Sequence, residues 1–157
     1  MDGKVRETSV MEETTPEFDQ IANTYALVQD FYGRQMRAID SRDITSFVRT
    51  LTPDARMKHP NGSEDTGRDS IAARLHANAS QFEGLTICHW FDKLTIDQLT
   101  DETVKTSYYA MVSRTTPDGA TTFQPPFVVH DVLVRNQADG FQTSVREITV
   151  HGPGKLS

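Results

Sequence analysis

The chain has 157 residues, of which 24% are charged and 36% hydrophobic, and its formal net charge at pH 7 is −6. A chain of this length and composition forms one globular domain with a core of its own. The acidic balance argues against a nucleic-acid partner, and no apolar run approaches the ~20 residues that cross a bilayer.

The two ends and the single cysteine bear on domain limits and location. Residues 1–15 are polar and acidic and lack the apolar core of a secretory signal, so we expect a disordered tail there. One domain should occupy residues 16–151, followed by a flexible tail at 152–157. Cys88 has no partner for an internal disulfide, which is consistent with a reducing compartment. We therefore expect a cytoplasmic protein.

The first predicted element is a long amphipathic helix. Thr15 can cap its start, and Pro16 suits the first helical position. Apolar residues then recur at helical spacing and predict one buried face. These residues are Phe18, Ile21, Ala22, Tyr25, Tyr32, Met36 and Ile39.

Two shorter helices and a short strand complete the first half. Asp43 can cap a second helix that Pro53 stops. Residues 55–59 alternate between apolar and charged side chains, which predicts a strand ending at His59 on its apolar face. A third helix begins near residue 67 and ends near Gly84, a suitable C-terminal cap.

The second half has the period of two that is typical of strands. Strict alternation from residue 85 places His89 and Phe91 on one face, and Leu94 and Ile96 on the other. Further strands are predicted at 103–114, 127–135 and 141–150, with turns at 116–119 and 136–140. The segment from Thr121 to the Pro125-Pro126 pair is expected at an edge or bulge.

The strand at residues 127–135 is the most apolar of these. Both of its alternating sets are largely apolar, which suits a central strand covered on both faces. His130 and Asp131 interrupt the run and must point to opposite faces. Helices followed by four long antiparallel strands predict an α+β fold, with three N-terminal helices packed on a curved antiparallel sheet.

Three histidines, His59, His89 and His130, lie in strands among apolar residues. A histidine titrates near neutral pH, so one in an apolar cavity can act as a general base or acid. Each can equally be a hydrogen-bonded core residue. If all three shared one cavity, they would form a catalytic cluster.

Other candidate residues lie on the neighbouring strands. One residue of the Tyr108-Tyr109 pair should face a pocket, where its hydroxyl can donate to an oxyanion, although aromatic packing is the commoner role. Arg146 can pair with Asp131 or orient an acidic substrate, and the role of Glu147 is equally open. No metal-binding, nucleotide-binding or serine-hydrolase motif occurs in the sequence, so we expect neither a metal nor a cofactor.

Several sequence words, taken in order, resemble the SnoaL-like branch of the nuclear transport factor 2-like superfamily. They are LTPDARMKHP at 51–60, GRDSI at 67–71, CHW at 88–90, SYY at 107–109, HDVLVR at 130–135 and DGF at 139–141. The resemblance spans roughly residues 16–150. This branch includes polyketide cyclases, and its relatives include ketosteroid isomerase and scytalone dehydratase. It implies a cone-shaped sheet around a deep pocket that helices close, usually in a homodimer.

The resemblance also implies roles for individual residues. His59 takes the place of the isomerase's general-base aspartate, and the oxyanion-binding aspartate falls at His130 or Asp131. The isomerase's first-helix tyrosine falls near Gln35 and is therefore expected to be missing. His89 matches a histidine of the dehydratase.

The function expected from these features is acid–base catalysis without a cofactor. The enzyme would be a cyclase, isomerase or dehydratase for a hydrophobic, oxygenated small molecule of polyketide-type metabolism. The expected catalytic residues are His59, His89, His130 and Asp131. The expected substrate-binding residues are Tyr32, Phe91, Tyr108, Tyr109, Arg146 and Glu147.

Two alternatives remain open at this stage. Asp131 with Arg146 could open an epoxide, as in the limonene epoxide hydrolase relatives. The fold could also serve as a ligand-binding or partner-binding module without turnover. In each case we expect a homodimer, because three helices cannot cover both faces of the apolar central strand.

Overall fold

A computed structural model describes residues 16–137 and 140–152 of the chain. The predicted tail at residues 1–15 lies outside this range, as does nearly all of the tail predicted at 152–157. The helices are α1 (Pro16–Asp40), α2 (Ile44–Arg49), α3 (Arg68–Asn78) and the 3-10 turn η1 (Ala79–Phe82). The strands are β1 (Leu51–Lys58), β2 (Glu64–Thr66), β3 (Thr86–Leu99), β4 (Thr103–Thr115), β5 (Thr121–Phe123), β6 (Phe127–Asn136) and β7 (Gly140–Val150).

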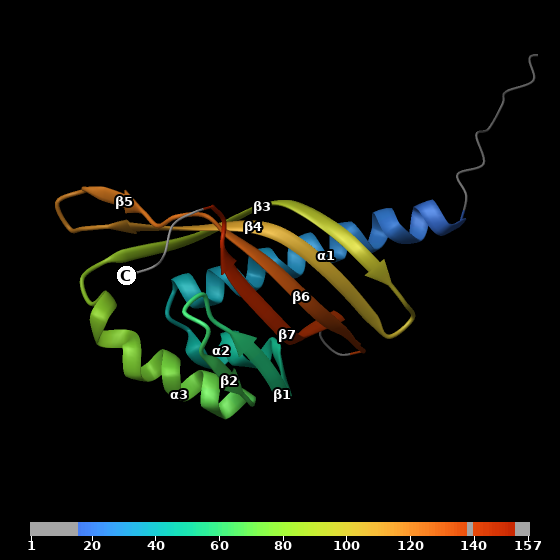
Figure 1. Cartoon of the computed structure of the whole chain (residues 1–157), viewed down its shortest axis with the longest axis horizontal. Helices are drawn as coiled ribbons and strands as arrows, with labels where there is room; N and C mark the ends of the chain where they lie inside the picture. Colours follow the sequence, from blue (N-terminus) through green and yellow to red (C-terminus); the bar gives the residue numbers. More distant parts are fainter. Residues whose placement is uncertain (1–15, 138–139, 153–157) are drawn as a thin grey trace, which may run out of the picture.

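The strands form one curved sheet, with the order β2-β1-β7-β6-β4-β3 and with β5 paired to β4. Neighbours are antiparallel except for β1 and β7, which are parallel. Figure 1 shows α1 running along one side of the sheet, while α2 and α3 gather near β1 and β2. The predicted α+β architecture is confirmed, and β6 lies between β4 and β7 as expected for the central strand.

The core lies between α1 and the sheet face that we call the inner face. Side chains of α1 from Val28 onward pack against inward-pointing residues such as Val104, Val129 and Leu133. A second apolar cluster lies where α2 and α3 cover β1, and it includes Phe47, Met57 and Ile71. Among the described helices, none is long and apolar enough to span a membrane.

The first half of α1 corrects the predicted buried face. Phe18 is 62% exposed, and Ile21, Tyr25 and Leu27 are exposed as well. The N-terminal turns of α1 extend past the ends of the strands (Figure 1), so the sheet does not cover these apolar side chains. The helical spacing identified the helix correctly, but before Val28 the only residue of the described helix that is buried is Thr24, a polar residue.

A β-bulge in β3 corrects the predicted faces of that strand. Lys93 adopts a positive φ of 56°, and the register with β4 shifts between Asp92 and Thr95. The bulge inserts an extra residue, which reverses the alternation beyond it. Leu94 and Ile96 therefore join the inner-face core instead of lying on the face opposite His89.

The first strand differs from its prediction in length. β1 begins at Leu51 and passes through Pro53, with a register shift against β7 between Leu51 and Arg56. A proline cannot donate a ladder hydrogen bond, and the irregular register accommodates it. The short β2, which pairs with β1 after the turn at Gly62, was not predicted.

Candidate functional site

The centre of the inner face holds a buried ion pair. Asp131 of β6 lies directly opposite Arg146 of β7 in the strand register. Arg146 donates from Nε to Asp131 Oδ1 at 3.0 Å and from Nη2 to Asp131 Oδ2 at 2.7 Å. Burial lowers the pKa of Arg146, but the Asp131 carboxylate outweighs burial and raises this pKa above its ordinary value. Both side chains are buried, so the pair is a fixed part of the core.

Two tyrosines bind the same carboxylate. The hydroxyl of Tyr32, on α1, donates to Asp131 Oδ2 at 2.9 Å, and that of Tyr108, on β4, lies 3.4 Å from the same oxygen. Burial raises the pKa of both phenols, and the Asp131 carboxylate raises that of Tyr32 further. Both tyrosines therefore remain protonated donors. Tyr32 lies one turn before Gln35, so a tyrosine of the first helix reaches the network although Gln35 itself is not one.

Gln35 closes the network on the helix side. Its Oε1 accepts from Arg146 Nη2 at 2.6 Å, and its Nε2 donates to Thr50 Oγ1 at 2.8 Å. The ion pair is thus hydrogen-bonded to α1 as well as between its two strands. Epoxide opening needs a carboxylate that can reach the substrate, and the Asp131 side chain is fully buried. The arrangement therefore fits a structural role better than epoxide chemistry.

His89 forms a different kind of arrangement at the end of α1. Its Nδ1 lies 2.6 Å from Oδ1 of Asp40, and its backbone N–H donates to the same oxygen at 3.0 Å. The imidazole is 30% exposed and the carboxylate 21% exposed. A carboxylate on Nδ1 fixes the tautomer and leaves Nε2 as a proton acceptor. No partner of Nε2 is found among the described residues.

His59 is also paired with a carboxylate, which it shares with an arginine. It lies one residue past the end of β1, and its Nε2 is 2.7 Å from Oδ2 of Asp65 on β2. Arg74 of α3 reaches the same Asp65 oxygen at 2.5 Å. Burial raises the pKa of the Asp65 carboxyl, but the hydrogen bonds from His59 and Arg74 outweigh burial, and the pKa lies below its ordinary value. This cluster ties the β1–β2 hairpin to α3.

His130 lies on the opposite face of the sheet from His89 and apart from the His59 cluster. The period of two in β6 places Asp131 on the inner face and His130 on the opposite, outer face, where it is exposed. Its Nδ1 lies 2.8 Å from the hydroxyl of Ser107, which in turn donates to Asp97. Tyr109 and Glu147 also lie on the outer face, where Glu147 binds Lys58.

The three strand histidines do not converge on one cavity. His130 is on the wrong face, and His59 and His89 belong to the ends of β1 and β3, with β7, β6 and β4 between them. Four strand spacings of about 4.8 Å amount to roughly 19 Å along the sheet. Each of the three imidazoles is bonded to a different side chain: His59 to Asp65, His89 to Asp40 and His130 to Ser107. Among the described residues, no three His, Cys, Asp or Glu side chains are grouped so that they could hold a metal ion.

An apolar strip of the inner face lies next to His89. We call it the inner strip; its members are Phe91, Ala110, Val112, Ile148 and Val150. They point to the same side as the core but are only partly buried. Val112 lies opposite His89 in the register, and Phe91 packs on Tyr32 with ring centroids 5.7 Å apart. The oriented imidazole therefore borders an apolar surface that the described chain leaves partly uncovered.

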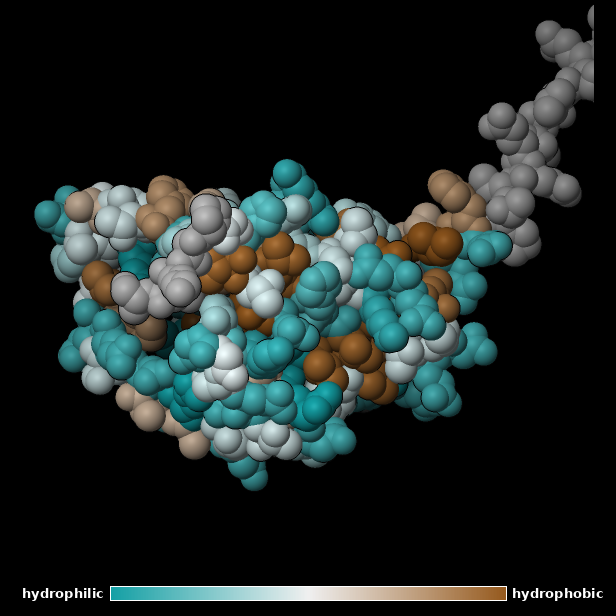
Figure 2. Space-filling model, in the orientation of Figure 1, coloured by the Kyte–Doolittle hydropathy of each residue, from teal (hydrophilic) through white to brown (hydrophobic). Residues whose placement is uncertain are grey.

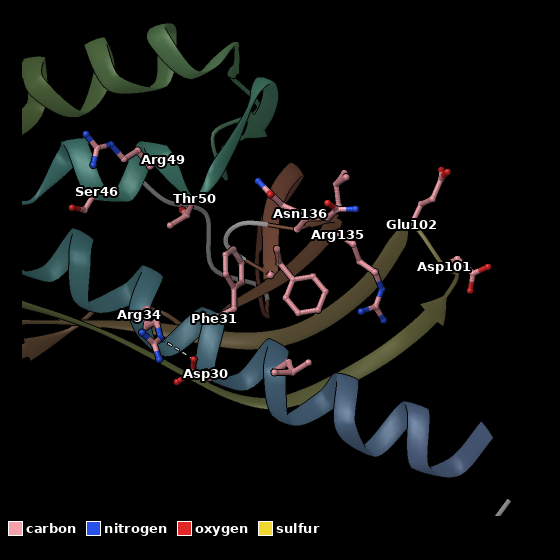
Figure 3. A pocket seen from close by; sticks show the side chains of 15 residues that line it. Asp30, Phe31, Arg34, Ser46, Arg49, Thr50, Asp101, Glu102, Arg135 and Asn136 are labelled. Atoms are coloured by element: carbon pink, nitrogen blue, oxygen red, sulfur yellow. Dashed lines mark hydrogen bonds and ion pairs between the residues drawn. The ribbon is translucent and has the colours of Figure 1, made fainter. Parts of the chain in front are cut away.

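A separate groove of about 1160 Å³ lies between α1, α2 and the ends of β6 and β7. Figure 3 shows Phe31 at its wall and the ion pair between Arg34 and Asp30 at its edge. Its lining includes side chains of both charges, with Arg49 and Arg135 as well as Asp101 and Glu102. None of the predicted catalytic or substrate-binding residues lines it. Because no histidine lines it either, acid–base chemistry is better placed at the inner strip.

Sequence reasoning missed Asp40 and Asp65, the carboxylates that hold His89 and His59. Asp40 is 49 positions from His89, and no local pattern links them. The weak signal for Asp40 was a carboxylate in the last turn of a helix, where the helix dipole disfavours it. Asp65 offered no signal, because β2 itself was not predicted.

Comparison with known proteins places these features in a family. The family model of the SnoaL-like domain matches residues 20–147. Aln2 from a Streptomyces species is 36% identical, with 82% of this chain and 91% of that chain covered and a TM-score of 0.76. ActVI-ORFA from Streptomyces coelicolor is 32% identical, covering 81% and 97% of the two chains with a TM-score of 0.74.

A further solved structure contains a ligand. A protein from Catenulispora acidiphila in complex with S-DNPA is 32% identical, covering 82% of this chain and 94% of that chain with a TM-score of 0.74. At 16% identity, an NTF2-like protein with a cystatin-like fold from Novosphingobium aromaticivorans shares the fold, with a TM-score of 0.71 over 92% of this chain and 94% of that chain. No curated protein sequence matches the chain significantly.

Proposed function

Because the chain belongs to the SnoaL-like domain family, we propose that it is a cofactor-independent acid–base enzyme in which His89 is the general base. The family includes polyketide cyclases and related enzymes, and its solved relatives support a polyketide-associated small-molecule enzyme or binding domain. The observation that carries the proposal is the imidazole–carboxylate pair of His89 and Asp40 beside the inner strip.

The chemistry follows from the geometry of this pair. Asp40 binds Nδ1 of His89, so Nε2 can accept a proton from carbon or oxygen of a bound substrate, and the carboxylate then stabilises the imidazolium. The inner strip offers apolar contact to the body of such a substrate. Proton removal beside a carbonyl gives an enolate. Return of the proton to another carbon completes an isomerisation, and attack of the enolate on a second carbonyl, with the proton returned to the new alkoxide, completes a cyclisation. Departure of a β-hydroxyl group, which takes the proton and leaves as water, completes a dehydration.

The other predicted catalytic residues take supporting roles in this proposal. Asp131 holds Arg146, Tyr32 and Tyr108, which shape the floor beneath the inner strip. His59 stabilises the β1–β2 hairpin through Asp65. Phe91 is the predicted substrate-binding residue with a direct place at the strip.

The test is proton exchange and turnover with aromatic poly-β-carbonyl compounds of the polyketide type. In D₂O, the wild-type protein should speed exchange of the acidic C–H protons, as followed by NMR. His89→Asn should lower the rate by about 10²–10⁴-fold, the usual contribution of a positioned general base. Asp40→Asn should lower it by at least about tenfold, since the tautomer is no longer fixed. Full activity in His89→Asn would overturn the assignment.

His59→Ala provides the matched comparison, measured on the same samples for melting temperature and rate. A structural His59 predicts a lower melting temperature with turnover retained in the folded fraction. A catalytic His59 predicts the reverse. If the wild-type protein binds these compounds without any exchange or turnover, the second candidate function applies, a ligand-binding module of the same family.

We also propose a homodimer formed through the outer face. Three aromatic side chains are exposed there on neighbouring strands: Trp90 is 55% exposed, and Tyr109 and Phe123 are exposed too. Figure 2 shows apolar side chains grouped over the middle of the sheet among polar ones. A second copy of the chain would cover such a patch. A monomer in light scattering at micromolar concentration would contradict this.

A further inference from the structure

An arginine on the inner face has no carboxylate partner. Arg114 lies opposite Ile87 in the register of β3 and β4, one row beyond the pair of His89 and Val112. Its Nε is buried and makes no hydrogen bond within the described chain. No ion pair joins it to a carboxylate of residues 16–137 or 140–152. This differs from Arg146, whose guanidinium is bonded to both Asp131 and Gln35.

The surroundings hold Arg114 in place without neutralising its charge. Its guanidinium carbon lies 5.3 Å from the ring centroid of Phe82, in a cation–π contact. Arg42 holds the backbone that carries Phe82 by donating from Nη2 to the carbonyl oxygens of Phe82 and Leu85. The Nη2 group of Arg42 is thus occupied by backbone carbonyls. The guanidinium N–H groups of Arg114 remain available to bind another group.

The position of Arg114 relative to His89 is set by the sheet. Residues on one face that are diagonal across two antiparallel strands have Cα atoms about 7–8 Å apart, within reach of long side chains. His89 and Arg114 are diagonal in this way, because His89 lies opposite Val112. A molecule lying on the inner strip with its reacting carbon at His89 therefore has Arg114 within reach of a substituent.

Resting on the function proposed above, we infer that Arg114 anchors an anionic group of the substrate, and that the substrate is an apolar molecule carrying a carboxylate. Guanidinium matches carboxylate in shape and charge and can bind it through two hydrogen bonds. A buried donor without a partner is unfavourable, and a bound carboxylate would relieve it. The same contact would fix which carbon faces the Nε2 of His89.

The experiment measures binding, so it does not depend on turnover. The probes are 1-naphthylacetate and its neutral isostere 1-naphthylacetamide, titrated by calorimetry into the full chain. Wild-type protein should bind the carboxylate at least about tenfold more tightly than the amide, the ratio expected of one charge-assisted contact. Added salt should reduce this ratio, because it weakens binding of the charged probe alone.

Variants then assign the preference to one residue. Arg114→Met should bind both probes within about twofold of one another, and Arg114→Lys should keep part of the preference, having the charge without the planar donors. Arg49→Met, which removes an arginine from the separate groove, should leave the ratio unchanged. A purely structural Arg114 would instead lower the melting temperature of Arg114→Met while the ratio stayed at its wild-type value, which would overturn the proposal.

Failure of this proposal can be told from failure of the proposed catalysis. His89→Asn should lose proton exchange and keep the carboxylate preference. A wild-type protein that binds neither probe, or binds both equally, would refute the Arg114 anchor whatever the proton-exchange assay shows. A wild-type preference that survives in Arg114→Met would refute it equally.

Discussion

Asp131→Asn is the substitution that best tests the described core. It keeps the shape of the side chain and removes its charge, which leaves the Arg146 guanidinium buried with Gln35 as its remaining strong acceptor. Breaking a buried ion pair by removing one partner costs about 3–5 kcal/mol of the free energy of unfolding. For a domain of this size that corresponds to a fall of about 6–20 °C in melting temperature.

An exposed ion pair next to Arg146 in β7 provides the matched control for this substitution. Glu147 pairs with Lys58 on the outer face, where both side chains are about half exposed. Exposed ion pairs contribute at most about 1 kcal/mol, so Glu147→Gln should be nearly neutral. Urea unfolding at pH 7 measures both variants. In the double variant Asp131→Asn with Arg146→Gln, the destabilisation should be smaller than the sum of the two single ones.

The same samples decide whether Asp131 is structural or catalytic. If it is structural, the rate per folded molecule should stay within a few-fold of wild type in the proton-exchange assay. An Asp131→Asn protein that unfolds within about 1 kcal/mol of wild type would refute the buried pair. A loss of rate without a loss of stability would return Asp131 to the catalytic set.

Two further predictions concern the other histidines. The pKa of the Asp65 carboxyl in the folded protein lies below its value in the unfolded chain. The carboxylate therefore stabilises the fold above about pH 4, and this stabilisation is lost as the pH falls through the folded pKa. Asp65→Asn should lower the melting temperature at pH 7, and its difference from wild type should shrink in acid. A constant difference between pH 7 and pH 3 would contradict the linkage. His130 is exposed on the outer face, so His130→Ala should change the rate less than about twofold and the stability by about 0.5 kcal/mol or less. A tenfold loss of rate would place it in the site after all.

The periodic parts of the fold could be predicted because they depend on local pattern. The long helix, the four long strands and the central place of β6 all follow from spacing and turn residues. The reversal of faces after Lys93 could not be predicted, because a bulge changes the register without an obvious sequence mark. The exposure of the first half of α1 could not be predicted either. Helical spacing identifies an apolar face, but it does not show whether another element covers that face.

For the candidate site, the sequence indicated which residue types to consider, but not which residues they bond to. His89, Phe91 and Arg146 were singled out from the sequence, and the strand register places all three on the inner face. Their roles depend on contacts between residues far apart in sequence, such as those between Asp40 and His89 or between Tyr32 and Asp131. Single-sequence patterns carry no information about such pairs. The resemblance to ketosteroid isomerase directed attention to His59, whose imidazole turns out to be held by Asp65.

The position of Asp40 distinguishes His89 from the other two histidines. A carboxylate in the last turn of a helix faces the negative end of the dipole, which is unfavourable by about 0.3–1 kcal/mol. Here the 25-residue helix α1 ends on that carboxylate, and the backbone N–H and imidazole of His89 offset the repulsion. His59 shares its carboxylate with an arginine, and His130 bonds to a hydroxyl on a wet surface. A general base for a hydrophobic substrate needs an orienting carboxylate, a free ring nitrogen and an apolar surface beside it. Of the three histidines, His89 alone meets all three conditions within the described structure. Its carboxylate, Asp40, pairs with no arginine or lysine there, its Nε2 makes no hydrogen bond, and the inner strip lies next to it.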